Sequence, residues 1–105
     1  MKEMTLHAPY PAIELISQAM QTYANAAYPP GGSECAQSAR EALLVASDSL
    51  IKQFDAATNT STVSRRLRSH IRAAVEYYFD LMSQQDQYVE FDQTAILSIL
   101  AGKGS

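Results

Sequence analysis

Half of the basic side chains in this sequence lie in one short stretch. Four of the eight Lys and Arg residues, Arg65, Arg66, Arg68 and Arg72, fall within eight positions. A guanidinium group stays charged at physiological pH and binds carboxylate or phosphate groups through paired hydrogen bonds. Helical spacing puts Arg65, Arg68 and Arg72 on one face, and Tyr77 follows them on the same predicted helix. These four residues are therefore the predicted binding site for an anion or an acidic partner.

The charge reverses immediately after this basic stretch. Five acidic residues follow with no base among them: Glu76, Asp80, Asp86, Glu90 and Asp92. One interpretation is a solvated helix face on which Arg72 and Glu76 pair at a spacing of four. Alternatively, the arginines bind nucleic acid or an acidic protein, or the basic end of one subunit contacts the acidic end of another. The net charge of −3 weakens nonspecific binding to nucleic acid, which rests on phosphate neutralisation.

Hydroxyl and basic residues are concentrated at positions 58–68, which read Thr-Asn-Thr-Ser-Thr-Val-Ser-Arg-Arg-Leu-Arg. This stretch resembles the turn and recognition helix of helix-turn-helix DNA-binding proteins. In such a helix, small hydroxyl residues contact phosphates and Arg binds guanine through two hydrogen bonds. The resemblance implies that Val63 and Leu67 are buried, and that six residues face DNA: Ser61, Thr62, Ser64, Arg65, Arg66 and Arg68. The sequence departs from the family pattern at Gln53, Ala57 and Thr58.

A second resemblance rests on Arg65 and His70, which are five positions apart. Their spacing is similar to the Arg-x4-6-His motif of HEPN-type ribonucleases, which are small helical bundles and usually dimers. Histidine titrates near neutral pH and arginine stabilises a phosphate, so the resemblance implies that the two residues cleave RNA. That family often has a different polar residue at the position of Arg66. The alternative is that His70 is a partly buried packing residue.

Other residues that could carry chemistry are few and scattered. His7, Cys35 and His70 lack the spacing of metal ligands, and the sequence contains no glycine-rich phosphate loop. We therefore expect no metal and no cofactor, and we favour a protein that is not an enzyme. One cysteine allows no internal disulfide, and the sequence shows neither a signal peptide nor a long apolar stretch. These features predict a cytoplasmic protein that does not enter a membrane.

Apolar residues that recur at spacings of three and four predict four helices. They cover residues 11–28, 33–57, 61–83 and 92–101. Ser33 and Asp92 are the predicted N-caps of the second and fourth helices, and Phe91 and Ile96 form a hydrophobic staple. Residues 1–10 are predicted to form an extended arm, because Pro9 and Pro11 favour extended conformations at Ala8 and Tyr10. Residues 102–105 are expected to be a flexible tail or an expression remnant.

These elements predict a single all-α domain spanning residues 1–105. We expect a four-helix bundle built on a long antiparallel hairpin of the second and third helices. Five apolar residues lie outside the core stripes of the long helices: Leu44, Val45, Ile51, Tyr77 and Phe79. A homodimer is expected to bury them, as in many small helical proteins. The favoured function is therefore a non-enzymatic protein–protein interaction module, with DNA binding as the alternative and RNA cleavage as a distant third.

Overall fold

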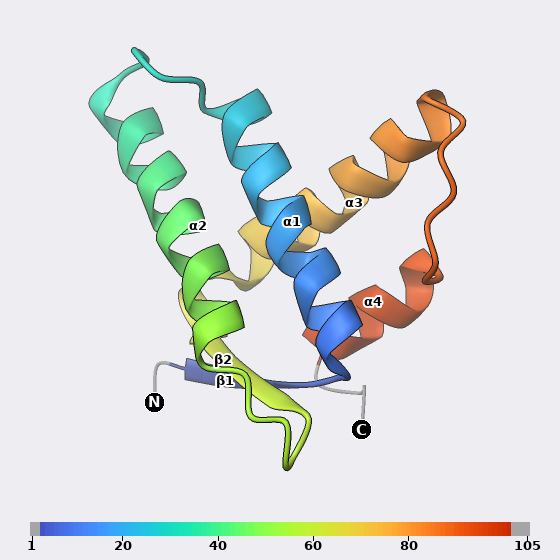
Figure 1. Ribbon diagram of the computed structural model, residues 1–105. Helices are drawn as coiled ribbons and strands as arrows, with labels where there is room; N and C mark the ends of the chain where they lie inside the picture. The colour runs from blue at the N-terminus through green and yellow to red at the C-terminus, as the bar shows by residue number, and fades with distance from the viewer. Residues whose placement is uncertain (1–2, 102–105) are drawn as a thin grey trace.

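The chain folds into four α-helices and a two-stranded sheet (Figure 1). The computed structural model describes residues 3–101. In chain order the elements are β1 (Glu3–His7), α1 (Tyr10–Ala27), α2 (Glu34–Lys52), β2 (Thr60–Ser64), the 3-10 helix η1 (Arg65–Leu67), α3 (Arg68–Gln84) and α4 (Gln93–Leu100). The prediction of a mostly helical chain is confirmed, but the prediction of an all-α four-helix bundle is wrong because the chain also forms the sheet.

Local sequence signals set the starts of three helices. α1 begins just before Pro11, which needs no hydrogen-bond partner in a first helical turn. α2 begins after Ser33, whose side-chain oxygen accepts a hydrogen bond from the Ala36 amide at 3.2 Å. α4 begins after Asp92, as predicted, although the Asp92 side chain makes no capping hydrogen bond. The predicted tail at residues 102–105 lies outside the described residues.

The predicted N-terminal arm is extended, and it pairs with a strand that the sequence analysis assigned to a helix. β1 and β2 are antiparallel, with Met4 opposite Val63 and Leu6 opposite Ser61. These four side chains are buried, whereas the alternate residues are exposed in β1 and half-buried in β2. The β-branched Thr and Val residues of β2 favour this pleated, half-buried setting over a helix. The third helix therefore begins only after η1, and α2 ends at Lys52 rather than near residue 57.

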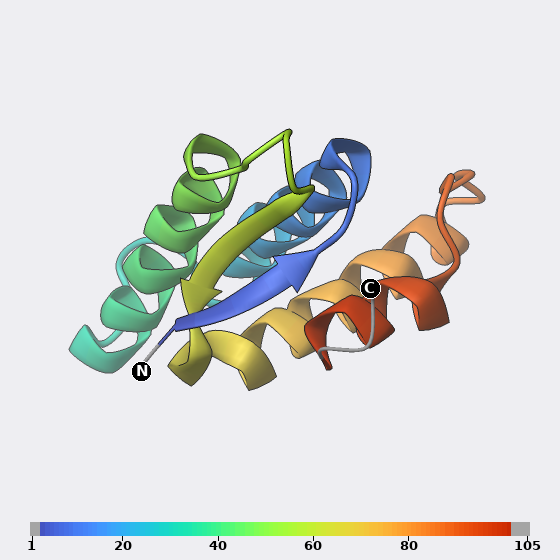
Figure 2. The same cartoon turned by 90° about the horizontal axis from the view of Figure 1, so that it is seen from below.

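The helical hairpin also differs from the predicted one. α1 and α2 pack against each other as neighbours in sequence, and α3 packs on α1 as well (Figure 1). β2 and η1 separate α2 from α3 along the chain, and α3 packs mainly on α1 and α4. The predicted hairpin of the second and third long helices is therefore wrong. Seen from below, the two strands run across one end of the helices, and α4 lies beside α3 (Figure 2).

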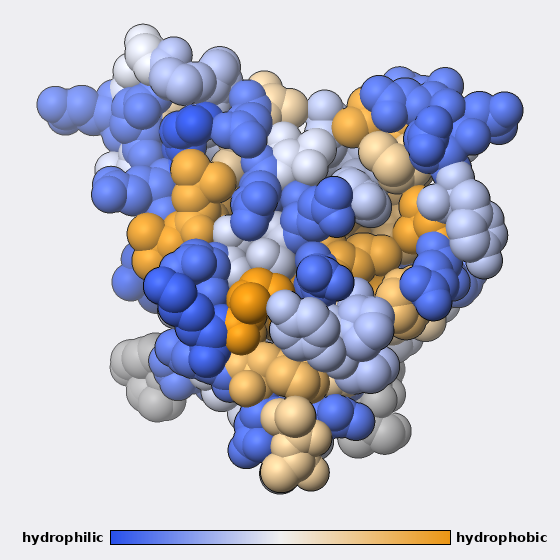
Figure 3. Space-filling view, viewed as in Figure 1, coloured by the Kyte–Doolittle hydropathy of each residue, from blue (hydrophilic) through white to orange (hydrophobic). Residues whose placement is uncertain are grey.

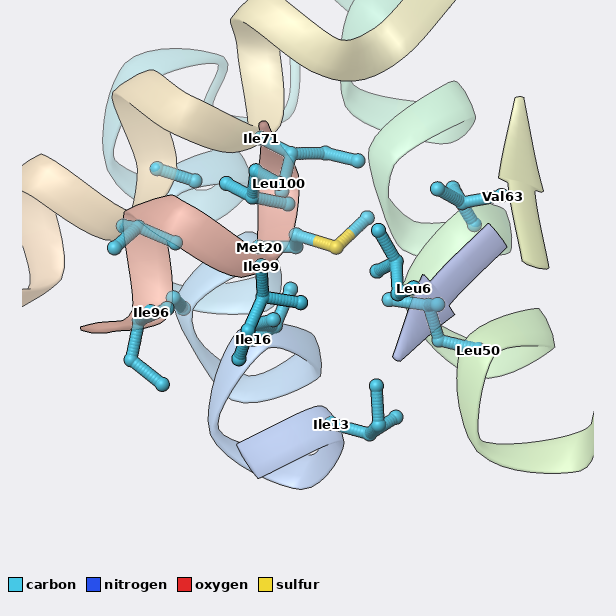
Figure 4. Packing of buried hydrophobic residues seen from close by; sticks show 14 of the residues in the cluster. Leu6, Ile13, Ile16, Met20, Leu50, Val63, Ile71, Ile96, Ile99 and Leu100 are labelled. Atoms are coloured by element: carbon cyan, nitrogen blue, oxygen red, sulfur yellow. The ribbon is translucent and has the colours of Figure 1, made fainter. Parts of the chain in front are cut away.

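One core fills the space between the helices and the inner face of the sheet. Figure 4 shows Leu6 and Val63 of the sheet on one side of Met20 of α1, and Ile96 of α4 on the other side. All four side chains are buried in a single hydrophobic cluster. The described residues therefore share one core, and the sheet forms part of its wall.

Most of the apolar surface that was expected to require a homodimer is covered within the single chain. Leu44, Ile51 and Phe79 are half-buried and pack against the core. Tyr77 is also half-buried. Val45 differs from these four, since 60% of its surface is exposed. Of these five residues, Val45 alone is still exposed enough to support a homodimer. The homodimer itself stays a prediction.

Candidate functional site

The basic stretch is located where β2 turns into α3. η1 carries Arg65 and Arg66, and Arg68 is the first residue of α3. All three are exposed, and no ion pair within residues 3–101 involves any of them. We call these three residues the arginine turn. A cation at a helix N-terminus costs about 0.3–1 kcal/mol, so the start of α3 does not stabilise this cluster.

Arg72 lies one turn further along α3 and is partly neutralised. Its Nε donates a hydrogen bond to the Glu76 carboxylate at 3.4 Å, which is the pairing that the sequence predicts. The two side chains are 59% and 49% exposed, and an ion pair this exposed contributes at most about 0.5 kcal/mol. Arg72 therefore adds less unpaired charge to the site than the arginine turn does.

Tyr77 lies on a different side of α3 from the arginines. It follows Arg72 by five residues, which is a rotation of about 140° around the helix. Its ring lies 5.7 Å from the ring of Tyr23 in α1, and Tyr23 also contacts Tyr28 with ring centroids 6.0 Å apart. Burial and the neighbouring Tyr28 raise the pKa of Tyr23 above its ordinary value of 10.0. The structure thus separates Tyr77 from the arginines and places it at the contact between α1 and α3.

A small groove opens beside the arginine turn, between β2 and α2. Its volume is about 270 Å³. Apolar side chains from α2, β2 and η1 line it: Ala42, Val45, Ala46, Val63 and Leu67. One acidic residue, Glu3 of β1, also lines it and lies opposite Ser64 in the sheet. We call this feature the β2–α2 groove. Four polar residues, Ser49, Gln53, Thr62 and Ser64, also line it, and the arginine turn follows Ser64 in the chain without lining it.

The sequence analysis missed this groove because it assigned residues 61–64 to a helix. Two signals were present in the sequence. Three of residues 60–64 are β-branched (Thr60, Thr62 and Val63), which favours a strand, and Val45 is a large apolar residue outside the buried stripe of its helix. Neither signal shows that the two segments lie side by side, as α2 and β2 do in the structure.

The residues assigned to DNA contact by the helix-turn-helix resemblance do not form one surface. Ser61 is 1% exposed, and its hydroxyl donates a hydrogen bond to the Leu50 carbonyl at 2.6 Å. The Thr62 hydroxyl donates to the side chain of Gln53. Ser61 to Ser64 belong to β2, so the predicted recognition helix is a strand at these positions. Arg65, Arg66 and Arg68 remain exposed beside it.

Arg65 and His70, the pair implied by the ribonuclease resemblance, differ in exposure. Arg65 is exposed in η1, whereas His70 is half-buried in α3. The Nδ1 atom of His70 is buried and makes no hydrogen bond within residues 3–101. This environment matches the alternative interpretation of His70 as a partly buried packing residue. The same part of the chain contains no cluster of three or more potential metal ligands, and Cys35 is exposed with a free thiol.

Larger hollows occur at the acidic end of α3. Cavities of about 610 and 550 Å³ lie on either side of the loop between α3 and α4, and Tyr88, Val89 and Phe91 line both. Figure 3 shows hydrophobic side chains gathered on this side of the molecule, with hydrophilic side chains around them. Tyr88 is 89% exposed. These hollows lack the unpaired cations that distinguish the arginine turn.

Comparison with models of protein families, with curated proteins and with solved structures gave no match to this chain. Within residues 3–101, no helix has both the length and the apolar character needed to cross a membrane. The functional argument therefore depends on the geometry of the arginine turn and the β2–α2 groove.

Proposed function

We propose that this chain is a small, non-enzymatic protein–protein interaction module that binds an acidic partner at the arginine turn. One observation carries the proposal: Arg65, Arg66 and Arg68 are exposed, have no ion pair within residues 3–101 and follow directly in the chain on Ser64, which lines a partly apolar groove. Arginine is enriched at protein interfaces, where its planar group pairs with carboxylates and its stem packs on apolar surface. A partner segment that carries acidic and apolar side chains together fits this surface.

An acidic protein fits better than nucleic acid for two reasons. The chain has a net charge of −3, which opposes binding to a polyanion over a large area. Five of the ten residues that line the β2–α2 groove are apolar, and a nucleic-acid backbone offers no apolar side chain to pack against them. The single cysteine is consistent with the further proposal of a reducing, cytoplasmic setting.

The test is a binding titration with fluorescently labelled polyglutamate. Replacing Arg65, Arg66 and Arg68 together by Gln should weaken binding about tenfold, since each surface charge contributes on the order of 0.5 kcal/mol. Lys52→Gln is the matched control. It removes a cation that pairs with Asp48 at 2.9 Å on α2, and it should change the affinity less than about twofold. Raising the salt concentration should weaken wild-type binding.

A short random-sequence DNA duplex serves as the competing ligand in the same titration. The proposal fails if the duplex binds more tightly than polyglutamate, or if the triple Gln variant binds polyglutamate as well as the wild type does. The homodimer, which stays a prediction, is tested separately by size-exclusion chromatography with light scattering at low and high salt. A monomer mass at micromolar concentration contradicts it.

A further inference from the structure

α3 carries its charge in a single row. All of its Arg, Lys, Asp and Glu residues occur at a spacing of four: Arg68, Arg72, Glu76 and Asp80. Residues four positions apart are neighbours on one face of a helix, and all four of these side chains are exposed. We call them the charge row. It is positive over its first half and negative over its second half, along a length of about 18 Å.

The charge row is only partly neutralised within the chain. At its centre, Arg72 and Glu76 pair with each other, but their side chains stay 59% and 49% exposed. At its ends, Arg68 and Asp80 take part in no ion pair within the described part of the chain. Gln84 donates one hydrogen bond to Asp80 at 3.0 Å, which leaves the carboxylate able to accept others. The row therefore has an unpaired cation at one end and an unpaired anion at the other.

The charge row lies on an outer helix. α1 is the middle one of the three long helices, with α2 on one side of it and α3 on the other (Figure 1). The fully buried residues of α3, Ile71, Ala74 and Val75, are outside the row. In the neighbouring row, Ser69 is exposed and Ala73 is half-buried, and both are small. Another helix can therefore lay a row of side chains into the shallow groove between these two rows.

We propose that a second copy of this chain binds antiparallel along the charge row, about a two-fold axis between Arg72 and Glu76. Arg68 then lies opposite Asp80 of the second copy. Arg72 lies opposite Glu76 of the second copy, and the symmetry forms each of the two pairs twice. Rows at a spacing of four run parallel to each other when two helices cross at about −50°, so both pairs form at once. The inference rests on the proposed function, because it names a second copy as an acidic partner of Arg68.

The order of charges selects one direction and one register. If the axis moves one helical turn toward the basic end, Arg72 faces Arg72 of the second copy. If it moves one turn toward the acidic end, Glu76 faces Glu76. A parallel arrangement with matching residues side by side places like charges together along the whole row, and like charges repel. The antiparallel, centred arrangement is the one in which every contact joins opposite charges.

The centre of this interface is a network of charges. The pair between Arg72 and Glu76 within each chain is kept, and the same two residues also face their opposites across the axis. Four side chains then alternate in sign around the axis, and such a network contributes more than an isolated surface pair does. Arg65 and Arg66 precede the row, and the pairing does not use them.

The experiment compares two double variants that have the same net charge as wild type. Arg68→Glu with Glu76→Arg puts like charges opposite each other at all four contacts. It should raise the Kd of the dimer at least about thirtyfold, since each exposed pair contributes about twofold to threefold. Arg68→Asp with Asp80→Arg exchanges two partners and keeps opposite charges at every contact. This matched control should stay within about threefold of the wild-type Kd.

Sedimentation equilibrium over a wide range of protein concentration measures each Kd, and circular dichroism establishes that both variants fold. High salt should weaken the wild-type dimer. Polyglutamate binding and the stability of the single chain are measured below the Kd of the dimer, where Arg68 has no partner from a second copy.

Each outcome has a defined meaning. A wild-type chain that stays monomeric at every concentration overturns the inference, and so does a dimer that is unaffected by Arg68→Glu with Glu76→Arg. Equal weakening by both double variants overturns the pairing of Arg68 with Asp80. If the dimer fails in any of these ways while the single chain still binds polyglutamate through the arginine turn, the proposed function stands without this inference.

Discussion

The two ends of α3 are both charged, but the surrounding chain holds them differently. At the basic end, β2 is paired with β1 and anchored to α2 by the buried hydrogen bond from Ser61 to Leu50. At the acidic end, residues 85–92 form a loop with large hollows on both sides, and Tyr88 is 89% exposed. The smaller cavity is therefore beside the more firmly held backbone.

Cavity size and the rigidity of the cavity walls therefore rank the two ends in opposite orders. The large hollows lie where a loop crosses between two helices, so their walls depend on the loop. The β2–α2 groove is less than half as large, but a strand, a helix and a 3-10 turn define its walls. A preorganised surface loses less conformational entropy on binding, which favours the basic end as the binding site.

The largest expected effect comes from removing the strand support of the basic end. Leu6 is 1% exposed in the core, so Leu6→Ala should lower the free energy of unfolding by about 2–5 kcal/mol. At the acidic end, Val89 is half-buried, and Val89→Ala should cost about 1 kcal/mol or less. Urea denaturation of both variants measures the difference. Equal losses of unfolding free energy in the two variants would show that the two ends of α3 are held equally firmly.

A smaller effect is expected from the hydrogen bond that anchors β2. Ser61→Ala leaves the Leu50 carbonyl without its side-chain donor, and it should cost about 1–3 kcal/mol. Ser64→Ala is the matched control, because Ser64 makes no side-chain capping hydrogen bond to η1, and it should stay within about 0.5 kcal/mol of wild type. If the urea midpoint of unfolding is the same for Ser61→Ala as for wild type, this hydrogen bond does not anchor β2.

Charge at the start of α3 should affect stability and binding in opposite directions. Arg68→Glu replaces an unfavourable cation by a favourable anion in the first turn and should raise the unfolding free energy by about 1 kcal/mol. The same variant should bind polyglutamate more weakly. Arg68→Gln should give roughly half the gain in stability, and high salt should reduce both gains. A variant that is less stable than wild type would show that Arg68 has a stabilising partner.

The smallest effect concerns the contact between α1 and α3 that lies between the two ends. The pKa of Tyr23 is raised by burial and by Tyr28, so the neutral phenol is favoured in the folded state. The associated stability is present below the unfolded pKa of 10.0 and is lost as the pH rises through the higher folded pKa. Melting temperatures from pH 8 to 11 should therefore fall less for Tyr23→Phe than for wild type. Melting temperatures that fall equally with pH in wild type and Tyr23→Phe would contradict the raised pKa of Tyr23.

The sequence predicted the elements whose signals are local. Pro11 starts α1, Ser33 caps α2 and Asp92 precedes α4, and each of these signals acts within a few residues of the boundary it sets. The extended N-terminal arm was also predicted, from its prolines. By contrast, Ser and Thr at positions 60–64 suit both a helix cap and a strand. The choice between those structures depends on β1, which is remote in sequence.

The candidate site was predictable only in part for the same reason. The arginines are visible in the sequence, and their exposure follows from their charge. The residues that surround the arginines could not be predicted. Residues 60–64 form a strand where a helix was expected, so Ser61 is buried and different residues lie beside Arg65. The groove joins α2 to β2, and no local pattern connects Val45 with Thr62.

The pairing of β1 with β2 also has a consequence for the order of folding. The two strands enclose α1 and α2 in one long loop, so a large entropic cost must be met before they pair. The α1–α2 hairpin is local and is expected to form early, with the sheet closing in a slower step. During that interval both strands have open edges and are exposed to association with other chains. The chain is therefore expected to be most prone to aggregation while it is still folding.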